Sequence, residues 1–334
     1  MSGAVLEISN LRIHFPGLFR DTEVLRDVGF TIRRGEVFGL VGESGSGKSM
    51  TASACLGMVP APGVVAGSVK LNGAELVGTP ATDLPGIRGR QAAMIFQNPM
   101  RSLNPFFSVG RQMTDVIRLH FGCSSVEAHA AAAEALCAAQ LPDPGLVLTK
   151  FPHQLSGGQM QRVMIALALA CKPAFLIADE PTTALDVTVQ AQIVSLLRKL
   201  ADEFGLAVLL ISHDLGVVSM VCDRVAVMYA GRIMELGSVD AIIGNPQHPY
   251  TKKLISVVPE IGRRDQELGS IPGTVPNPWA LPQGCAFSNR CEMASDLCRQ
   301  AKPDQVAVAP DHWAACHYVD QRNDMSLKRV GKAS

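Results

Sequence analysis

The sequence predicts an α/β fold with a largely parallel, buried sheet. Two purely apolar strands are expected at Phe175–Ala178 and Ala207–Ile211, with the helical segment Val187–Phe204 between them. Residues 1–40 alternate between apolar and polar positions with turn signals in between, a pattern typical of several short strands. Because strands that alternate with helices pair mostly in parallel, we expect helices to cover the faces of this sheet.

The remaining elements follow from the same patterns. A helix is expected from Lys48 to Met58 after a glycine-rich turn, and a pair of strands around the segment GSVKLNG at residues 67–73. Residues 107–150 should be helical, with an alanine-rich part at Glu127–Gln140. A further helix is expected at Gln159–Cys171.

The composition changes after about Pro259. Prolines, glycines and four cysteines replace the regular periodicity there, so we expect a domain boundary and a small, irregular, cysteine-rich extension. The two expected units are residues 1–258 and 259–334. Two units suit a length of 334 residues at about 100–200 residues per domain.

Charge and hydropathy argue against two classes of protein. Lys plus Arg and Asp plus Glu each number 30, and the resulting net charge of zero does not favour binding to nucleic acid or membrane by bulk electrostatics. The longest apolar run, Val163–Cys171, has nine residues, whereas a bilayer span needs about 20. The first residues lack a basic region followed by an apolar stretch, so we expect no signal peptide and a cytosolic chain.

A glycine-rich segment matches a phosphate-binding loop. Gly42-Glu-Ser-Gly-Ser-Gly-Lys-Ser49 fits G-x-x-x-x-G-K-[ST] and stands between the apolar strand Val37–Val41 and a helix, the context that this motif requires. Backbone amides and the helix N-terminus would hold phosphate oxygens, Lys48 would reach the β- and γ-phosphates, and Ser49 would ligate Mg²⁺. The motif indicates a P-loop NTPase, with contacts expected from Gly42, Ser44, Gly45, Ser46, Gly47, Lys48 and Ser49.

A second motif is an apolar strand that ends in two acids, Asp179 and Glu180. At the carboxyl end of that strand, Asp179 would hold Mg²⁺ through water and Glu180 would polarise an attacking water. Many apolar strands end in acids for structural reasons, so this motif indicates a catalytic site only together with other motifs of the sequence.

The decisive segment is Leu155-Ser-Gly-Gly-Gln159, which stands about 20 residues before the acidic strand. Ser156, Gly157 and Gly158 at a helix start offer a hydroxyl and backbone amides to an anion. Followed by Met-Gln-Arg162, the segment resembles the signature sequence of ATP-binding cassette (ABC) ATPases. The resemblance implies a RecA-like core, an antiparallel β subdomain and a helical subdomain at about residues 100–160. It also implies that the signature, Gln159 included, faces the γ-phosphate of ATP held by a second cassette.

Other positions match the same family. Gln97 follows an apolar strand, Ala92–Phe96, where the family has the glutamine that joins Mg²⁺ and water to the transmembrane partner. Ala184-Leu185-Asp186 looks like the D-loop, with Thr183 where serine is common. His213 looks like the switch histidine that contacts the γ-phosphate. These resemblances imply catalytic roles for Glu180, Gln97 and His213.

Two residues are candidates for stacking on the adenine base. Phe15 is preferred and Phe19 is the competitor, because Pro16–Asp21 looks like an insertion. Met50 stands where many cassettes have threonine, and its backbone contacts to nucleotide should survive that change.

The C-terminal part resembles one subfamily of the ABC ATPases. Pro246–Thr251, Ile271–Gly273 and Gly284–Cys291 resemble the extension of peptide- and nickel-type importer ATPases, and Asn98–Val109 resembles the region of that subfamily that faces the permease. The resemblance covers nearly the whole chain. It implies an ATPase at the cytoplasmic face of the bacterial inner membrane that powers import of dipeptides, oligopeptides or related small solutes.

The implied partners are two transmembrane permease subunits, a second ATPase chain that is homologous but different, and indirectly a periplasmic or extracellular solute-binding protein; no nucleic acid is expected. One alternative is a non-transport cassette ATPase, a binding, remodelling or regulatory factor that acts on ribosomes or DNA, although such proteins usually carry two cassettes in one chain or a long coiled-coil insertion. A metal-sensing regulator that retains a nucleotide fold is another, and the complete set of hydrolytic residues counts against it.

Four of the nine cysteines, Cys285, Cys291, Cys298 and Cys316, are spaced C-x₅-C-x₆-C-x₁₇-C. A cytosolic chain keeps its thiols reduced, so metal binding is favoured over disulfides. Four thiolates suit tetrahedral Zn²⁺ or an iron–sulfur cluster, and unligated buried thiols are the third possibility. The spacing does not decide between them; the family resemblance favours [4Fe–4S].

Overall fold

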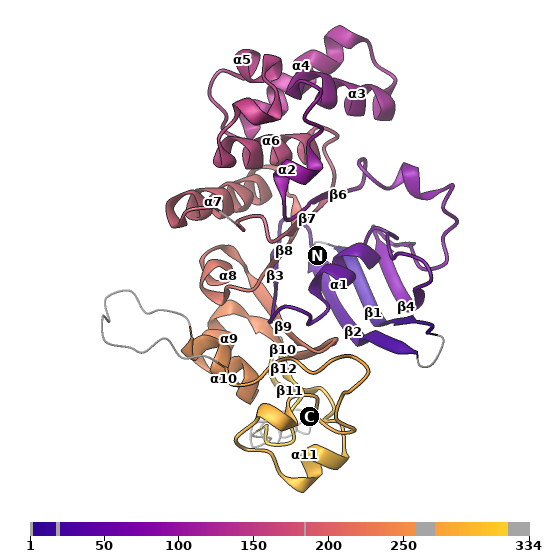
Figure 1. Ribbon diagram of the computed structural model, residues 1–334, viewed down its shortest axis with the longest axis vertical. Coiled ribbons are helices and arrows are strands. Elements are labelled where there is room, and N and C mark those ends of the chain that lie inside the picture. Colours follow the sequence, from indigo (N-terminus) through magenta and orange to yellow (C-terminus); the bar gives the residue numbers. More distant parts are fainter. Residues whose placement is uncertain (1–2, 18–20, 184, 258–270, 320–334) are drawn as a thin grey trace, which may run out of the picture.

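Two β-sheets form the framework of the chain (Figure 1). The computed structural model describes residues 3–17, 21–183, 185–257 and 271–319. Within these ranges a largely parallel central sheet carries most of the helices, and a smaller antiparallel sheet lies beside it. The predicted α/β class is therefore confirmed.

The smaller sheet has the strand order β2-β1-β4-β5 and is antiparallel throughout. Leu6, Ile8 and Ile13 are buried, whereas Glu7 and Arg12 between them are exposed. This alternation places one face of the sheet in the core, as the pattern of the first 40 residues predicted. The strands are β1 (Ala4–Phe15), β2 (Thr22–Arg33), β4 (Val64–Leu71) and β5 (Ala74–Glu75).

The central sheet is parallel from β9 to its edge strand β6, where the strands run in the order β9-β3-β8-β7-β6. These strands are β3 (Val37–Val41), β6 (Ala92–Ile95), β7 (Phe175–Asp179), β8 (Ala207–Ser212) and β9 (Arg224–Tyr229). Every residue of β3, β7 and β8 is buried, as expected for strands covered on both faces. Because the strands are parallel, their carboxyl ends meet at one edge of the sheet, where ligands of open α/β sheets bind.

The helices confirm the sequence pattern. The glycine-rich turn leads into α1 (Lys48–Ala54), and the region predicted to be helical at 107–150 contains three separate helices. Between α1 and β8 the helices are α2 (Pro99–Ser102), α3 (Val109–Phe121), α4 (Ser125–Ala138), α5 (Pro144–Thr149), α6 (Gly157–Leu169) and α7 (Val187–Phe204). They are followed by α8 (Leu215–Val221), α9 (Val239–Gly244) and α10 (Pro249–Ser256). Helices α3, α4 and α5 form a group at the top of Figure 1.

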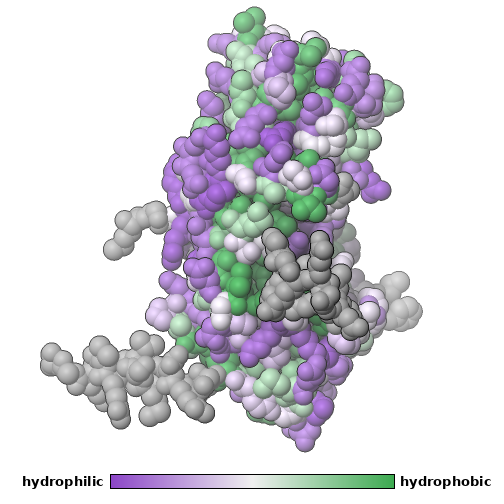
Figure 2. All heavy atoms as spheres, turned by 90° about the vertical axis from the view of Figure 1, so that its left-hand side faces the viewer, coloured by the Kyte–Doolittle hydropathy of each residue, from purple (hydrophilic) through white to green (hydrophobic). Residues whose placement is uncertain are grey.

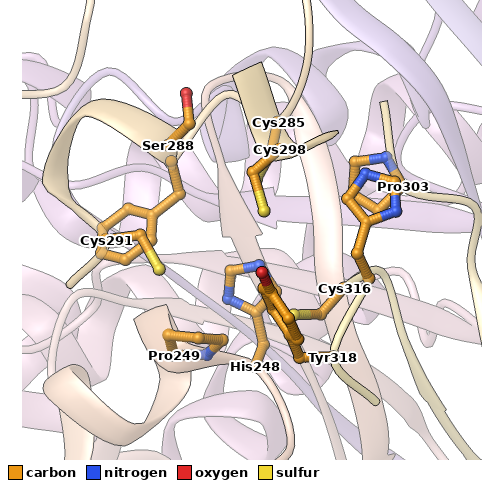
Figure 3. A pocket seen from close by; sticks show the side chains of 11 residues that line it. His248, Pro249, Cys285, Ser288, Cys291, Cys298, Pro303, Cys316 and Tyr318 are labelled. Carbon is orange, nitrogen blue, oxygen red and sulfur yellow. The ribbon is translucent and has the colours of Figure 1, made fainter. Parts of the chain in front are cut away.

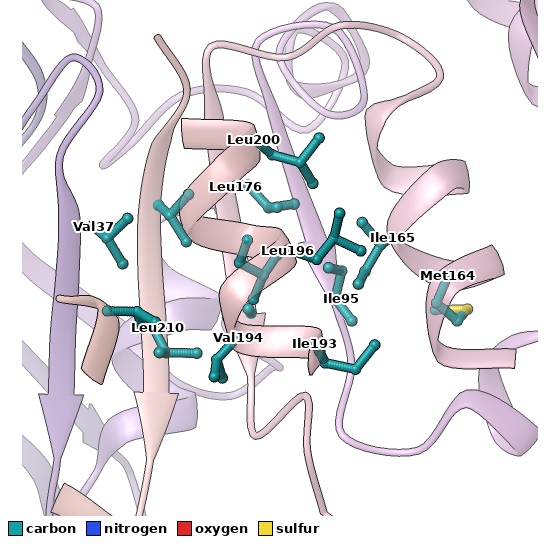
Figure 4. Packing of buried hydrophobic residues seen from close by; sticks show 14 of the residues in the cluster. Val37, Ile95, Met164, Ile165, Leu176, Ile193, Val194, Leu196, Leu200 and Leu210 are labelled. Carbon is teal, nitrogen blue, oxygen red and sulfur yellow. The ribbon is translucent and has the colours of Figure 1, made fainter. Parts of the chain in front are cut away.

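Helix α7 packs its apolar face against the rest of the core (Figure 4). Ile193, Leu196 and Leu200 recur every three or four residues and are buried on one side of the helix. They belong to the same buried cluster as Leu176 of β7 and Ile165 of α6. A second buried cluster joins the inner face of the smaller sheet to the opposite face of the central one.

The C-terminal extension adds two strands to the central sheet. Strand β12 (His312–Ala314) pairs antiparallel with β10 (Arg232–Ser238), and β11 (Val306–Ala309) pairs with β12. The extension also contains a short helix, α11 (Asp296–Gln300). The sequence predicted little regular structure here, because strands of three and four residues show too little periodicity. The expected domain boundary at residues 258 and 259 lies outside the described residues.

Glu235 on β10 ties the extension to the sheet. Its carboxylate is fully buried, accepts hydrogen bonds from the backbone amides of Gln247 (2.8 Å) and His248 (2.9 Å), and lies 2.8 Å from Nε2 of His312. Burial by itself would raise the pKa of Glu235. The hydrogen bonds, with that to His312 the strongest, outweigh burial and hold the pKa below its usual range.

The surface mixes hydrophilic and hydrophobic residues. Figure 2 shows the face that lies on the left of Figure 1, where patches of hydrophobic residues stand between hydrophilic ones. Among the helices described, none combines the length and the apolar character needed to cross a membrane.

Replacing Glu235 with Gln should lower the free energy of unfolding by about 2 kcal/mol at pH 7, because charged hydrogen bonds are lost in the interior. The pKa of Glu235 in the folded state is below its value of about 4.3 in the unfolded chain. Its contribution is therefore fully present above that value and is lost as the pH falls through the folded-state pKa. Thermal unfolding should show a difference from the parent that is large at pH 7 and shrinks below about pH 4.

The exposed Glu203 of α7 provides the matched control, since Glu203→Gln should leave the unfolding temperature unchanged at either pH. Equal unfolding temperatures for the parent and Glu235→Gln at pH 7 would contradict the role given to this carboxylate.

Candidate functional site

The phosphate-binding loop predicted at Gly42–Ser49 leaves the carboxyl end of β3 and enters α1. Gly42 has a φ of 156°, and a Cβ at this position would lie 2.1 Å from the carbonyl oxygen of Met228 on β9. Gly47, with a φ of 104°, is the N-cap of α1. The loop therefore lies against the neighbouring strand so closely that glycine is required at both positions.

Lys48 is the first residue of α1, and only 5% of its surface is exposed. Its ammonium group donates hydrogen bonds to the carbonyl oxygens of Gly42 (2.8 Å) and Glu43 (3.0 Å). Burial lowers the pKa of Lys48, while the nearby carboxylates of Glu180 and Asp179 act in the opposite direction. A buried cation beside the converging loop is placed to bind phosphate oxygens.

Asp179 is the last residue of β7 and is also buried. Burial raises the pKa of Asp179, and a hydrogen bond with the Ser49 side chain opposes that shift. The second carboxylate oxygen, Oδ1, is buried and has no hydrogen-bond partner among the described residues. An acid and a hydroxyl side by side, with one oxygen unpartnered, fit the ligands of a hard cation such as Mg²⁺.

Glu180 follows directly and is the point at which the three predicted catalytic residues meet. Its Oε2 atom accepts hydrogen bonds from Nε2 of Gln97 (2.8 Å) and from the hydroxyl of Thr183 (3.0 Å). Nδ1 of His213 lies 3.5 Å from the same oxygen. Glu180 has a φ of 47°, so its side chain leaves the end of β7 from an unusual backbone conformation.

These groups open onto a pocket of about 500 Å³. The phosphate-binding loop forms one part of its wall, the predicted catalytic residues form another, and the C-terminal part of the chain forms the rest. Its lining residues are Glu43, Ser44, Gln97, Glu180, His213, Leu254, Val257 and Ile271.

The signature residues do not line this pocket. Ser156 caps α6: its hydroxyl accepts a hydrogen bond from the amide of Gln159 (3.3 Å), and Oε1 of Gln159 accepts one from the amide of Ser156 (3.1 Å). Ser156 and Gly157 are exposed, and Gly158 is half-buried. Helix α6 lies well above α1 in Figure 1, so the chain does not bring its signature to its own phosphate-binding loop.

Asp186 of the predicted D-loop is the N-cap of α7, and its carboxylate accepts a hydrogen bond from the amide of Val189 (2.9 Å). The Asp186 side chain is exposed. The start of α7 lies beside the signature, because a Cβ at Gly158 would lie 3.0 Å from the side chain of Val189. Ala184 lies outside the described residues.

The predicted adenine-stacking residue, Phe15, is the half-buried last residue of β1. A Cβ at Gly63 would lie 2.9 Å from its ring, so the ring packs against the chain before β4. The competing residue, Phe19, lies outside the described residues. Met50 is half-buried and packs against the core between the two sheets.

The four predicted cysteine ligands line one small pocket (Figure 3). Cys285 and Cys298 are buried, Cys291 and Cys316 are half-buried, and the Ser295 hydroxyl lies 3.6 Å from Sγ of Cys298. Burial raises the pKa of Cys285 to about 11 and also raises those of Cys291 and Cys316. Across the described ranges, no group of three or more His, Cys, Asp or Glu side chains has an arrangement that would hold a metal ion.

Three contacts of the site were not predicted from the sequence. One is the hydrogen bond from Thr183 to Glu180. In the others, the phenol oxygen of Tyr250 accepts a hydrogen bond from the amide of Glu43 (3.0 Å), and Nη1 of Arg290 pairs with both carboxylate oxygens of Glu43 (3.1 and 3.0 Å). The only signal in the sequence was that Tyr250 and Arg290 lie in segments that carried the C-terminal resemblance.

Comparisons with known proteins bear on this arrangement. Residues 25–183 match the family described as "ABC transporter", and residues 234–298 match "Oligopeptide/dipeptide transporter, C-terminal region". The oligopeptide transport ATP-binding protein OppD of Salmonella typhimurium is 46% identical over 94% of this chain and 94% of its own. The chain belongs to the ATP-binding subunits of oligopeptide/dipeptide ABC transporters.

Two further similarities are consistent with this family. The dipeptide transport ATP-binding protein DppD of Escherichia coli is 42% identical over 94% of this chain and 97% of its own. A dimeric structure of MJ0796, a bacterial ABC transporter cassette, covers 70% of this chain and 98% of its own with a TM-score of 0.63 and 28% identity. The predicted cassette fold with its C-terminal extension is confirmed. The chain is an ABC-type ATPase coupled to transport. This membership favours the transport ATPase over the two alternatives, the non-transport factor and the metal-sensing regulator.

Lys48→Ala in this ABC subunit should weaken the binding of MgATP about 10- to 100-fold, which corresponds to the loss of about 1.5–3 kcal/mol of charged hydrogen bonding. Titration calorimetry on the full-length chain measures this directly. Lys199→Ala, which removes an exposed lysine from α7, should leave the affinity unchanged. Equal affinities for the parent and Lys48→Ala would refute the assignment of the loop.

Proposed function

We propose that the chain binds MgATP at the Gly42–Ser49 loop and hydrolyses it to power the import of oligopeptides or dipeptides. One observation carries the proposal: Gln97, Thr183 and His213 all reach the same oxygen of Glu180 at the end of β7. A carboxylate held in this way can orient and polarise a water for attack on the γ-phosphate. The substrate class comes from the family and from the names of the relatives.

Each residue of the site has a chemical task in this proposal. The amides of the loop and Lys48 bind the phosphates, and Ser49, Asp179 and Gln97 hold Mg²⁺. The bound cation would neutralise charge that develops on the β- and γ-phosphates. His213 contacts the γ-phosphate beside Glu180. Further contacts to the nucleotide come from the ring of Phe15, which stacks on the adenine, and from the backbone of Met50.

A second cassette completes the site. Ser156 and Gly157 are exposed at the start of α6, away from the chain's own pocket, and Asp186 is exposed near them. In a dimer these groups, together with Gly158 and Gln159, face the γ-phosphate held by a homologous but different partner chain. The dimeric cassette among the similar structures supports this arrangement. Because both chains contact ATP, its binding favours the closed dimer.

The permease subunits bind the region around α2. In the segment Asn98–Val109, Phe106 is 83% exposed and Met100 is 60% exposed. Large apolar side chains at such exposure suit an interface with a protein partner. Closure of the two cassettes would be transmitted to two transmembrane permease subunits through this region. Binding to the permease would place the chain at the cytoplasmic face of the bacterial inner membrane. A solute-binding protein on the other side of the membrane would supply the peptide.

The extension holds a [4Fe–4S] cluster through Cys285, Cys291, Cys298 and Cys316. The donor set supports this part of the proposal, since four thiols share one pocket and the Ser295 hydroxyl is directed at the sulfur of Cys298. Zn²⁺ held by the same four thiolates is the alternative. A group bound by all four thiolates would cross-link the extension.

Glu180→Gln should preserve ATP binding and lower turnover at the site that this chain provides by about 10²–10⁴-fold, because the group that polarises the water is lost. ATP hydrolysis and peptide uptake by the assembled transporter are the measurements. Glu134→Gln on the surface of α4 is the control and should be fully active.

If the transporter with Glu180→Gln kept full activity, the same substitution would be introduced in both cassettes. Loss of activity only in the double variant assigns hydrolysis to the partner's site. Full activity in the double variant would remove the catalytic role from Glu180.

Cys291→Ser tests the metal at the extension. Protein purified without oxygen should be brown, with a broad band in the visible spectrum, and the substitution should bleach it and make the extension sensitive to protease. The variant should still bind ATP, because the cassette has a buried core of its own. Cys137→Ser, at an exposed cysteine of α4, should keep the colour. If the parent protein is colourless and contains one Zn²⁺, the site is a zinc site and not a cluster. If the parent protein contains no metal and its extension is fully ordered, the four cysteines are unligated buried thiols.

A further inference from the structure

Arg290 of the C-terminal extension reaches across the fold to the phosphate-binding loop. Only 6% of its side chain is exposed. Nη1 donates to both carboxylate oxygens of Glu43, at 3.1 and 3.0 Å, and to the phenol oxygen of Tyr229 at 3.3 Å. Nε donates to the carbonyl of Pro272 at 2.8 Å and Nη2 to that of Ile271 at 3.0 Å. All three nitrogens of the guanidinium group therefore have partners.

Glu43 is the second residue of the loop, and each of its polar groups is held. Its carboxylate pairs with Arg290, its amide donates to the phenol oxygen of Tyr250 (3.0 Å), and its carbonyl accepts a hydrogen bond from the ammonium group of Lys48 (3.0 Å). Two of these three partners lie outside the loop. They belong to α10 and to the extension.

An aromatic cluster connects the same region to the cysteine pocket. The rings of Tyr229 and Tyr250 are 4.7 Å apart, and Phe287 lies 5.3 Å from the first and 5.2 Å from the second. Phe287 also lines the pocket of the four cysteines, and Arg290 directly precedes Cys291. The position of the guanidinium group is thus fixed by the fold of the extension.

The contact has a direct physical consequence for the loop. A glycine-rich loop has much conformational freedom, and binding phosphate with its amides requires that this freedom be removed. A buried guanidinium group needs a carboxylate partner, since an unpaired charge in the interior is costly. Pairing with Arg290 therefore restricts Glu43 and the amides that follow it before the nucleotide arrives, which lowers the entropy lost on binding.

We propose that Arg290 is a positioning residue for ATP binding: it holds the loop through Glu43, so that the C-terminal extension sets the nucleotide affinity of the cassette. This inference rests on the proposed role of the Gly42–Ser49 loop in binding the phosphates of ATP. It gives the extension a task in the ATPase cycle that does not depend on which group its cysteines bind.

The test compares Glu43→Gln, Arg290→Gln and the double variant in the full-length chain. By calorimetry with MgATP, each single variant should bind about tenfold more weakly, and the double variant should be no weaker than either single one, because both remove the same contact. In the assembled transporter the KM for ATP should rise while kcat changes little. Arg299→Gln, at an exposed arginine of α11 paired with Asp296, is the matched control and should bind like the parent.

Arg290→Gln can also disturb folding, so Glu43→Gln carries the test if that variant is unstable. Glu43 is partly exposed and lies outside the extension. Its variant should unfold at a lower temperature than the parent, because Arg290 loses its charged partner, but it should be folded at the temperature of the titration and bind MgATP more weakly. Parental affinity in Glu43→Gln, or lower stability in Arg290→Gln with unchanged affinity of the folded protein, would overturn the inference. Lys48→Ala separates the two proposals: if it weakens binding and Glu43→Gln does not, only the inference fails, and if neither does, the phosphate-binding role of the loop fails.

Discussion

The parallel pairing of β3, β8 and β7 is the constraint on which the proposed ATP site depends. Five residues of β3 are in register with β8, and five of β8 are in register with β7. Parallel strands in this register must end at one edge, so the loop after β3, the acids after β7 and His213 after β8 meet there although they are far apart in the chain. The complete burial of these strands keeps the edge rigid.

Burial at this edge also determines the electrostatics. Lys48 and Asp179 are both removed from water, so burial opposes the charged form of each, and the lowered and raised pKa values are two sides of one effect. Their opposite charges offset part of that cost. A triphosphate with its cation brings charge of both signs to the same place. It would therefore supply charged partners to the two buried groups, Lys48 and Asp179, whose charged forms are opposed by burial.

What the sequence could predict depended on how local each feature is. The loop, the acids Asp179 and Glu180, and the helices around them follow from short motifs and periodicity. The convergence of Gln97 on Glu180 joins positions 83 residues apart and follows only once the strand order is known. The pair of Arg290 and Glu43 is 247 residues apart, and neither residue stands in a pattern that indicates its partner. The two short strands of the extension were missed because their pairing with β10, not their own periodicity, makes them strands.

The addition of β12 to the sheet has a consequence for how the protein is made. A ribosome releases β10 long before residues 306–314, and at about 5–20 residues per second the interval lasts several seconds. If β10 pairs with β9 during that time, its other side offers an open row of amides and carbonyls. Open edges of this kind recruit strands from other chains. Pairing of β12 with Glu235 and Leu236 covers part of this edge and so protects it from strands of other copies of the chain.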